Sequence, residues 1–171
     1  MVANFGYGAL LITFLIAIYG AIAAAYGALK NRQRWIDSAR LAMLLTFPLI
    51  SLSALSLISL LLAGRYEYEF VASVTSNSMP LYLRITALWG GQAGSLLFWA
   101  WLMSAFASAV TLRKWERDRE FLPWVIVVAL VTLTFFLILI LFFENPFRAI
   151  WQLPSGQFEL AMLQPAGSKT L

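Results

Sequence analysis

Long uncharged stretches alternate with short charged ones along the chain. No Asp, Glu, Lys or Arg occurs within 1–29, 41–64, 85–112 or 121–143. Each stretch exceeds the ~20 apolar residues with which an α-helix crosses a hydrocarbon layer of ~30 Å. The pattern therefore predicts an all-α, polytopic membrane protein with four transmembrane helices. The predicted spans are about 6–29, 41–64, 87–112 and 121–143.

These spans leave two polar segments that we expect on one side of the membrane. The segment 65–86 forms an outer loop between the second and third helices, and 144–171 forms an extended outer tail. The first stretch lacks the basic start of a secretory signal and is about twice as long as a signal's apolar core. We therefore predict that it is a retained helix within a single membrane domain, 1–171.

The charge distribution predicts the orientation of the helices. The segment 30–40 carries net +3 and 113–120 carries net +1, whereas the two outer segments are neutral. Because basic loops remain in the cytoplasm, both termini are expected on the periplasmic side of the inner membrane. The basic residues are split between two short loops, which argues against a nucleic-acid partner. The expected partners are the lipid bilayer and other membrane proteins.

The composition limits the chemistry of the chain. Hydrophobic residues make up 61% and charged residues 12%, and there is no His and no Cys. Thiolate and imidazole metal ligands are therefore missing, and no pair of groups has matched acid and base roles. The spans also lack the ionisable residues that ion pathways need. We expect no catalytic and no metal-binding residues in this chain on its own.

Aromatic and acidic residues alternate at the start of the outer loop, in Arg65-Tyr-Glu-Tyr-Glu-Phe-Val71. Period-two alternation predicts a short extended segment. Its aromatic residues would lie at the membrane interface, while Glu67 and Glu69 would face water.

The third span begins with an unusual glycine cluster, Gly90, Gly91 and Gly94, between Trp89 and Trp99. Each glycine costs ~1 kcal/mol relative to Ala in a helix, so helix propensity does not explain the cluster. One interpretation is a tightly packed helix start with tryptophan anchors. The other is a surface for a flat hydrophobic ligand such as a porphyrin, quinone or lipid.

Several motifs together resemble the amino-terminal part of CcmF, the cytochrome c maturation protein F family, from about residue 5 to about residue 164. They are Ser76-Asn77, Met79-Pro80, Tyr82-Leu83-Arg84, Leu88-Trp-Gly-Gly-Gln-Ala-Gly-Ser-Leu-Leu-Phe-Trp99 and Asn145-Pro146-Phe147. The chain departs from the family where Ala93 replaces a usual glutamate. The family's histidine-proline-proline motif is also missing after Leu163-Gln164, so the chain looks truncated.

The resemblance implies an amino-terminal module of a haem lyase, supporting haem delivery to apocytochrome c together with cytochrome c assembly subunits. The family's haem-ligating histidines and its tryptophan-rich segment would lie beyond residue 171, so any haem would be held through partners. Possible haem contacts in this chain are Arg84, Trp89 and Trp99. An interfacial anchor, or a partner for Glu67 or Glu69, is the alternative role for Arg84. Residues expected to pack against partners are Asn77, Pro80, Tyr82, Gly90, Gly91, Gly94 and Ser95.

A second hypothesis assigns the chain to a different functional class. The missing histidines, Ala93 and the degraded carboxyl end also suit a non-catalytic structural subunit of a larger respiratory or photosynthetic membrane complex. Native partners would distinguish this hypothesis from the first.

Overall fold

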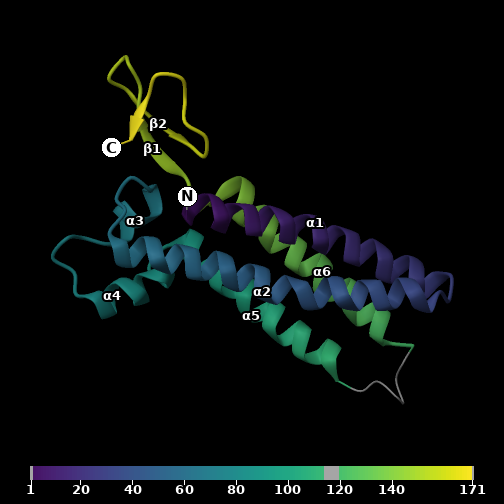
Figure 1. The fold of residues 1–171 in the computed structure, drawn as a ribbon. Helices are drawn as coiled ribbons and strands as arrows, with labels where there is room; N and C mark the ends of the chain where they lie inside the picture. Colours follow the sequence, from purple (N-terminus) through teal and green to yellow (C-terminus); the bar gives the residue numbers. More distant parts are fainter. Residues whose placement is uncertain (1, 114–119, 171) are drawn as a thin grey trace.

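The computed structural model describes residues 2–113 and 120–170 and consists mainly of four long helices (Figure 1). Each is long and apolar enough to cross a membrane, which confirms the all-α, four-helix prediction. The bounds are α1 (Val2–Leu29), α2 (Gln33–Ala63), α5 (Gln92–Leu112) and α6 (Leu122–Ile138), the last continued by the π-helical η2 (Leu139–Phe143). The chain is therefore a multi-pass membrane protein.

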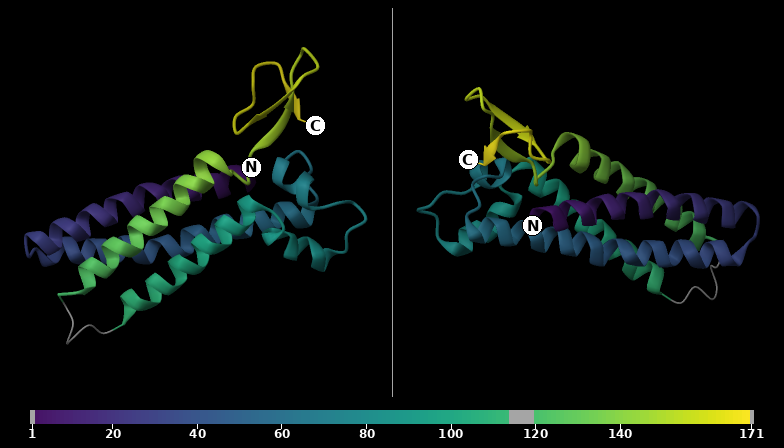
Figure 2. Two further views of the ribbon diagram at one scale, coloured as in Figure 1. Left: turned by 180° about the vertical axis from the view of Figure 1, so that it is seen from behind. Right: turned by 45° about the horizontal axis from the view of Figure 1, so that its top comes forward.

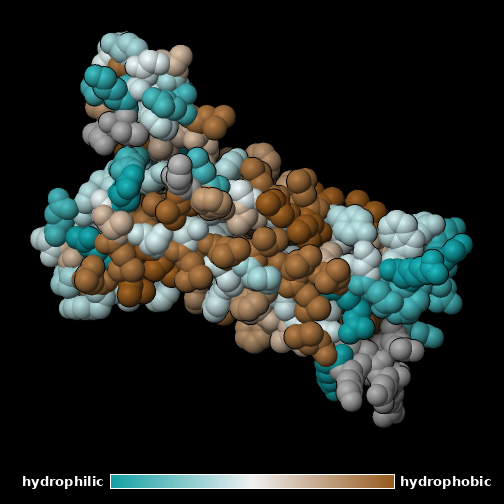
Figure 3. Space-filling view, viewed as in Figure 1, coloured by the Kyte–Doolittle hydropathy of each residue, from teal (hydrophilic) through white to brown (hydrophobic). Residues whose placement is uncertain are grey.

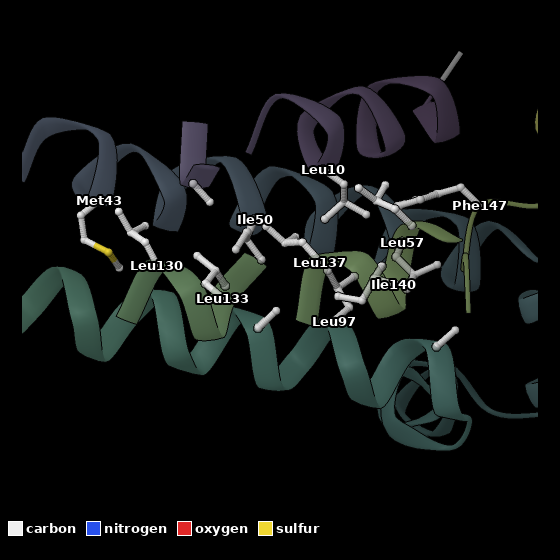
Figure 4. Packing of buried hydrophobic residues seen from close by; sticks show 14 of the residues in the cluster. Leu10, Met43, Ile50, Leu57, Leu97, Leu130, Leu133, Leu137, Ile140 and Phe147 are labelled. Carbon is white, nitrogen blue, oxygen red and sulfur yellow. The ribbon is translucent and has the colours of Figure 1, made fainter. Parts of the chain in front are cut away.

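The four helices pack as a bundle in which each has two main neighbours. Helix α2 lies between α1 and α5, and α6 closes the bundle against α1 and α5. Buried apolar residues from all four helices meet along the bundle axis (Figure 4). The residues of this core labelled in Figure 4 are among its largest fully buried side chains: Leu10, Met43, Ile50, Leu57, Leu97, Leu130, Leu133, Leu137, Ile140 and Phe147.

Small residues on α1 allow its neighbours to approach closely. A Cβ atom added to Gly20 would lie 2.6 Å from Leu130 Cδ1 of α6 and 3.0 Å from Ala42 Cβ of α2. Gly20 thus lies where α2 and α6 both pack closely on α1, as expected where helices in a membrane associate through close packing.

The two ends of the bundle differ in how much chain they carry (Figures 1 and 2). At the turn end, Lys30–Arg32 connects α1 to α2. Helix α5 also ends there, at Leu112. At the opposite, capped end lie the short helices α3 (Glu69–Val74) and α4 (Leu81–Thr86), the 3-10 turn η1 (Ala87–Trp89) and a small sheet. Most of the predicted second basic loop, 114–119, lies outside the described residues. Figure 3 shows apolar side chains gathered over the middle of the bundle and polar ones towards its ends.

The tail folds into a small antiparallel sheet rather than remaining simply extended. Strand β1 (Ala149–Gln152) lies between β2 (Phe158–Ala161) and β3 (Lys169–Thr170), in the order β2-β1-β3. The register pairs Ala149 with Ala161 and Gln152 with Phe158. The strand pairing thereby satisfies backbone groups of the tail.

The predicted extended segment at Arg65–Val71 is wrong, because Tyr66 and Glu67 lie in a turn and α3 begins at Glu69. Only Tyr68 forms a strand-like bridge, to Ala149, while Glu69 N donates to Arg148 O at 3.0 Å. Phe70 and Val71 are buried in the core, so tertiary packing overrides the alternating pattern. These bonds tie the loop between α2 and α5 to the tail.

Candidate functional site

The candidate site is the connection from α4 into α5, where the sequence motifs concentrate. Helix α4 leads into η1, and Gly90 and Gly91 then separate η1 from the start of α5 at Gln92. Gly91 precedes α5 in an extended conformation (φ −131°, ψ 167°) and offers no side-chain cap. The chain therefore turns sharply before the helix begins, whereas the sequence predicted a continuous span from about residue 87.

Two of the glycines allow this turn to pack against its own chain. A Cβ atom on Gly94 would collide with Leu88 O and lie 2.6 Å from Phe70 Cζ, and one on Gly91 would lie 3.0 Å from Phe70 Cε2. Ser95 Oγ donates to Trp89 O at 3.2 Å and links η1 to α5. The Phe70 ring and η1 thus occupy the space that the missing side chains leave.

Arg84 organises the loop that precedes this turn. Its Nε donates to Met79 O at 3.2 Å, and its Nη2 lies 3.3 Å from Ser76 O and 3.4 Å from Asn77 O. Its Nη1 reaches Leu62 O, near the end of α2, at 3.4 Å. One guanidinium thereby satisfies several main-chain carbonyls, including one of the unpaired carbonyls at a helix C-terminus.

The loop around Arg84 contains the other polar motif residues. Pro80 precedes α4, and its carbonyl accepts hydrogen bonds from Leu83 N and Arg84 N at 3.0 and 3.2 Å. Asn77 and Tyr82 have exposed side chains. Pro80 therefore stabilises the start of α4, while the other two side chains remain accessible to a partner.

An aromatic groove opens between α2 and α5 beside the turn. Its volume is about 340 Å³, and its lining is apolar apart from one serine. The Trp89 and Phe98 ring centroids lie 5.2 Å apart, and those of Phe98 and Trp101 lie 6.1 Å apart. Trp101 Nε1 donates to Ser51 Oγ at 2.9 Å and satisfies the serine. The groove is thus formed by Trp89, Phe98, Trp101, Leu88, Ser51, Ala54, Leu55 and Ile58.

The structure separates two of the predicted haem contacts. Trp89 joins the aromatic groove, while Trp99, which is 57% exposed, is not among the residues that line it. Phe98 and Trp101 complete the groove, and sequence reasoning missed both. Their i, i+3 spacing places them on one face of α5 and was the signal that could have identified them.

Charged side chains near the site pair locally. Arg65 Nη2 lies 2.6 Å from Glu67 Oε1, so Glu67 pairs with Arg65 and not with Arg84. The hydrogen bond and charge of Glu67 raise the pKa of Arg65. Burial, and then the charge of Glu67, raises the pKa of Tyr68.

The arrangement is suited to packing and binding rather than to bond-breaking chemistry. Within 2–113 and 120–170, no group of three His, Cys, Asp or Glu residues could hold a metal ion. The groove offers flat apolar surfaces, and its single hydroxyl is already hydrogen-bonded. No residue that lines the groove could ligate haem iron in the usual way or pair with a propionate.

Comparison with known proteins identifies relatives along nearly the whole chain. It is 28% identical over 169 residues to the cytochrome c-type biogenesis protein CcmF of Haemophilus influenzae, covering 98% of this chain and 26% of the relative. It is 29% identical over 165 residues to CcmF of Escherichia coli, covering 96% and 25%. No family model matches the chain. The chain thus spans about a quarter of the length of these curated relatives.

A solved structure shares the fold. The cytochrome c haem lyase CcmF superposes with a TM-score of 0.81 at 21% identity, over 86% of this chain and 25% of that one. The helical bundle described above therefore occurs in a larger membrane protein.

Proposed function

We propose that this chain, a homologue of the amino-terminal part of the CcmF cytochrome c biogenesis proteins, is a membrane module that supports haem delivery to apocytochrome c. It does so with other segments or subunits that supply the haem ligands. The observation that carries the proposal is the match along 98% of the chain, which includes the glycine turn of the candidate site. The resemblance seen in the motifs between Leu88 and Trp99 points the same way.

In this proposal the module acts as a scaffold and holds no haem of its own. The chain has no His, and the guanidinium of Arg84 is hydrogen-bonded to backbone carbonyls. The tight turn at Gly91 and Gly94 fixes η1 against α5 and α3, which gives the capped end a defined shape. Partner segments would bind this shape and the exposed side chains of Asn77, Tyr82 and Trp99.

The capped end faces the periplasm in this proposal, and both termini lie on that side. Four basic residues, Lys30, Arg32, Arg34 and Arg40, lie in the segment 30–40 at the turn end, where Asp37 is the acidic residue, and 113–120 adds a net charge of +1. The capped end carries acidic and basic residues in balance. By the positive-inside rule, this asymmetry favours a cytoplasmic turn end.

Gentle purification of the native protein tests the proposed function. Intact mass, mass-spectrometric identification of partners and an absorbance spectrum would be recorded on the same sample. We expect cytochrome c assembly proteins to co-purify, with any haem absorbance following those partners when they are stripped away. Stoichiometric association with a respiratory or photosynthetic complex, without assembly proteins, would contradict the proposal and support a structural subunit.

A further inference from the structure

A second cavity, separate from the aromatic groove, lies at the capped end. It has a volume of about 240 Å³, equivalent to about eight water molecules at ~30 Å³ each. Its walls come from α3, the start of α5, the end of η2 and the segment that leads to β1. The lining residues are Glu69, Phe70, Ser73, Gly91, Gln92, Ala93, Phe143, Glu144, Asn145 and Arg148.

The cavity carries charges of both signs that have no side-chain partner among residues 2–113 and 120–170. Glu69, Glu144 and Arg148 all line it, and none makes a side-chain ion pair or hydrogen bond with another described residue. The positive side is extended by the first turn of α5, whose free N–H groups lie at Gln92 and Ala93. That turn contains no acidic residue and no side-chain cap.

A buried side chain also opens onto the cavity. Asn145 is 8% exposed, and its Oδ1 accepts a hydrogen bond from Phe147 N at 3.0 Å. Its Nδ2 makes no hydrogen bond within the part of the chain that the structure describes. Among the described residues, the buried side-chain atoms without a partner are Ser53 Oγ and Tyr66 OH, so Asn145 Nδ2 is accessible, and a ligand oxygen in the cavity would accept a hydrogen bond from it.

The position of the cavity connects it to the lipid phase. Phe143, which is 67% exposed, ends the membrane span Leu122–Phe143 and lines the cavity. A molecule in the cavity would therefore have its polar part among charged groups and an apolar part along α6. The carboxylates of Glu69 and Glu144 are acceptors for the three N–H donors of a primary ammonium group.

We propose that this cavity binds the headgroup of a phospholipid with a primary amine, such as phosphatidylethanolamine. The phosphate is held by Arg148, by the N-terminus of α5 and by the Asn145 amide. The ammonium donates hydrogen bonds to Glu69 and Glu144. This inference does not depend on the proposed role in cytochrome c biogenesis.

Lipid competition in native mass spectrometry tests the proposal on the whole detergent-purified, delipidated protein. Palmitoyl-oleoyl phosphatidylethanolamine, phosphatidylcholine and phosphatidylglycerol would be added in equal amounts. We expect retention of phosphatidylethanolamine to exceed that of phosphatidylcholine by about tenfold, because the quaternary amine of phosphatidylcholine has no N–H to donate. Equal retention of the two lipids by the wild-type protein would overturn the proposal without any variant.

Variants separate the two halves of the site. Glu69→Gln with Glu144→Gln should abolish the preference for the amine, and Arg148→Gln should reduce retention of every phospholipid by about tenfold. Glu159→Gln changes an exposed carboxylate on β2 outside the cavity and should leave the preference unchanged. The same loss in Glu159→Gln would overturn the proposal.

Free phosphoethanolamine distinguishes a lipid from a soluble ligand with the same chemistry. We expect it to displace no bound lipid even in large excess, since it lacks the acyl chains that lie along α6. Displacement of the lipid by free phosphoethanolamine at matched concentration would show that the natural occupant is soluble and would overturn the lipid assignment.

Discussion

Carbonyl groups near helix C-termini accept hydrogen bonds from an arginine at both ends of the bundle, but the two arginines differ in how many other carbonyls they contact. At each end an arginine donates to carbonyls near a helix C-terminus: Arg40 Nη2 to Thr111 O at 3.0 Å at the turn end, and Arg84 to Leu62 O at the capped end. Among the described residues, the Arg40 side chain makes this one hydrogen bond, whereas Arg84 also donates to three carbonyls of the loop between Ser76 and Met79. The turn end contains a short connection between helices, whereas at the capped end α3, α4, η1 and the sheet together form a folded surface.

The difference teaches where substitutions should matter. A connection of three residues between long helices tolerates change, because the packed helices determine its geometry. The capped end depends on individual contacts, among them those of Gly91 and Gly94 with Phe70 and the hydrogen bonds of Arg84, and the Trp101–Ser51 bond links α2 to α5 farther along the bundle. Variants that remove these contacts one at a time measure how much each contributes to stability, and a variant at the turn end provides the comparison.

The largest effect is expected for Gly94→Val. Its side chain would overlap Leu88 O and the Phe70 ring, and overpacking of this kind costs at least ~3 kcal/mol. SDS-induced unfolding in mixed micelles would measure the loss of folding free energy. Gly8→Ala is the matched control, because nothing lies within 4 Å of a Cβ at that position, and it should not destabilise the protein. Equal stability of the two variants would show that the turn does not pack as described.

The next largest effect is expected for Arg84→Gln. Several charge-assisted bonds are lost from a half-buried group, so the loop should open with a cost of about 2 kcal/mol. Limited proteolysis between Ser76 and Met79 would detect this opening. Arg40→Gln removes a single bond at the turn end and should cost about 1 kcal/mol without exposing the loop. Equal protease sensitivity of the two variants would remove the distinction between the ends.

A smaller effect is expected for Trp101→Phe. The change keeps an aromatic ring beside Phe98 but deletes the hydrogen bond to Ser51, which costs about 1 kcal/mol. The SDS unfolding midpoint would report it. Ser51→Ala removes the same bond and also the donation from Ser51 Oγ to Phe47 O, so the double variant should lose less than the sum of the two single variants. Additive losses would contradict a direct interaction.

The smallest effect is expected for Arg65→Gln. Its ion pair with Glu67 has 57% of the arginine side chain exposed, and such pairs contribute about 0–1 kcal/mol. The unfolding free energy should change by less than in Gly94→Val, Arg84→Gln or Trp101→Phe, and added salt should reduce the difference further. A loss of unfolding free energy as large as that of Arg84→Gln would contradict this small contribution of the Arg65–Glu67 ion pair.

The sequence predicted the membrane helices well and the cap poorly, for physical reasons. Long apolar runs such as that between Phe121 and Phe143 have few alternatives to a helix in a bilayer. The alternating pattern predicted an extended segment through Val71. The chain instead forms a short helix over Glu69–Val74, which buries Phe70 in the core. The sheet depends on pairing between Ala149 and Ala161, which no local signal specified.

The candidate site was predicted in part. The sequence identified the glycines and Arg84 as candidates by residue type. It did not predict that the glycines contact Phe70 or that Arg84 donates to main-chain carbonyls, because these contacts join separate segments of the chain. Trp99 and Trp89 looked equivalent because both are tryptophans beside the cluster. Only helix geometry places Phe98 and Trp101, rather than Trp99, next to Trp89.

The central claim, that the capped end faces the periplasm and the turn end the cytoplasm, is tested most directly by single-cysteine labelling. The natural chain has no Cys, so Gln33→Cys at the turn end and Ser155→Cys between β1 and β2 each create one exposed thiol. A membrane-impermeant maleimide is added to intact cells and to permeabilised cells. The account predicts that Ser155→Cys is labelled in intact cells and Gln33→Cys only after permeabilisation; labelling of Gln33→Cys alone in intact cells would contradict it.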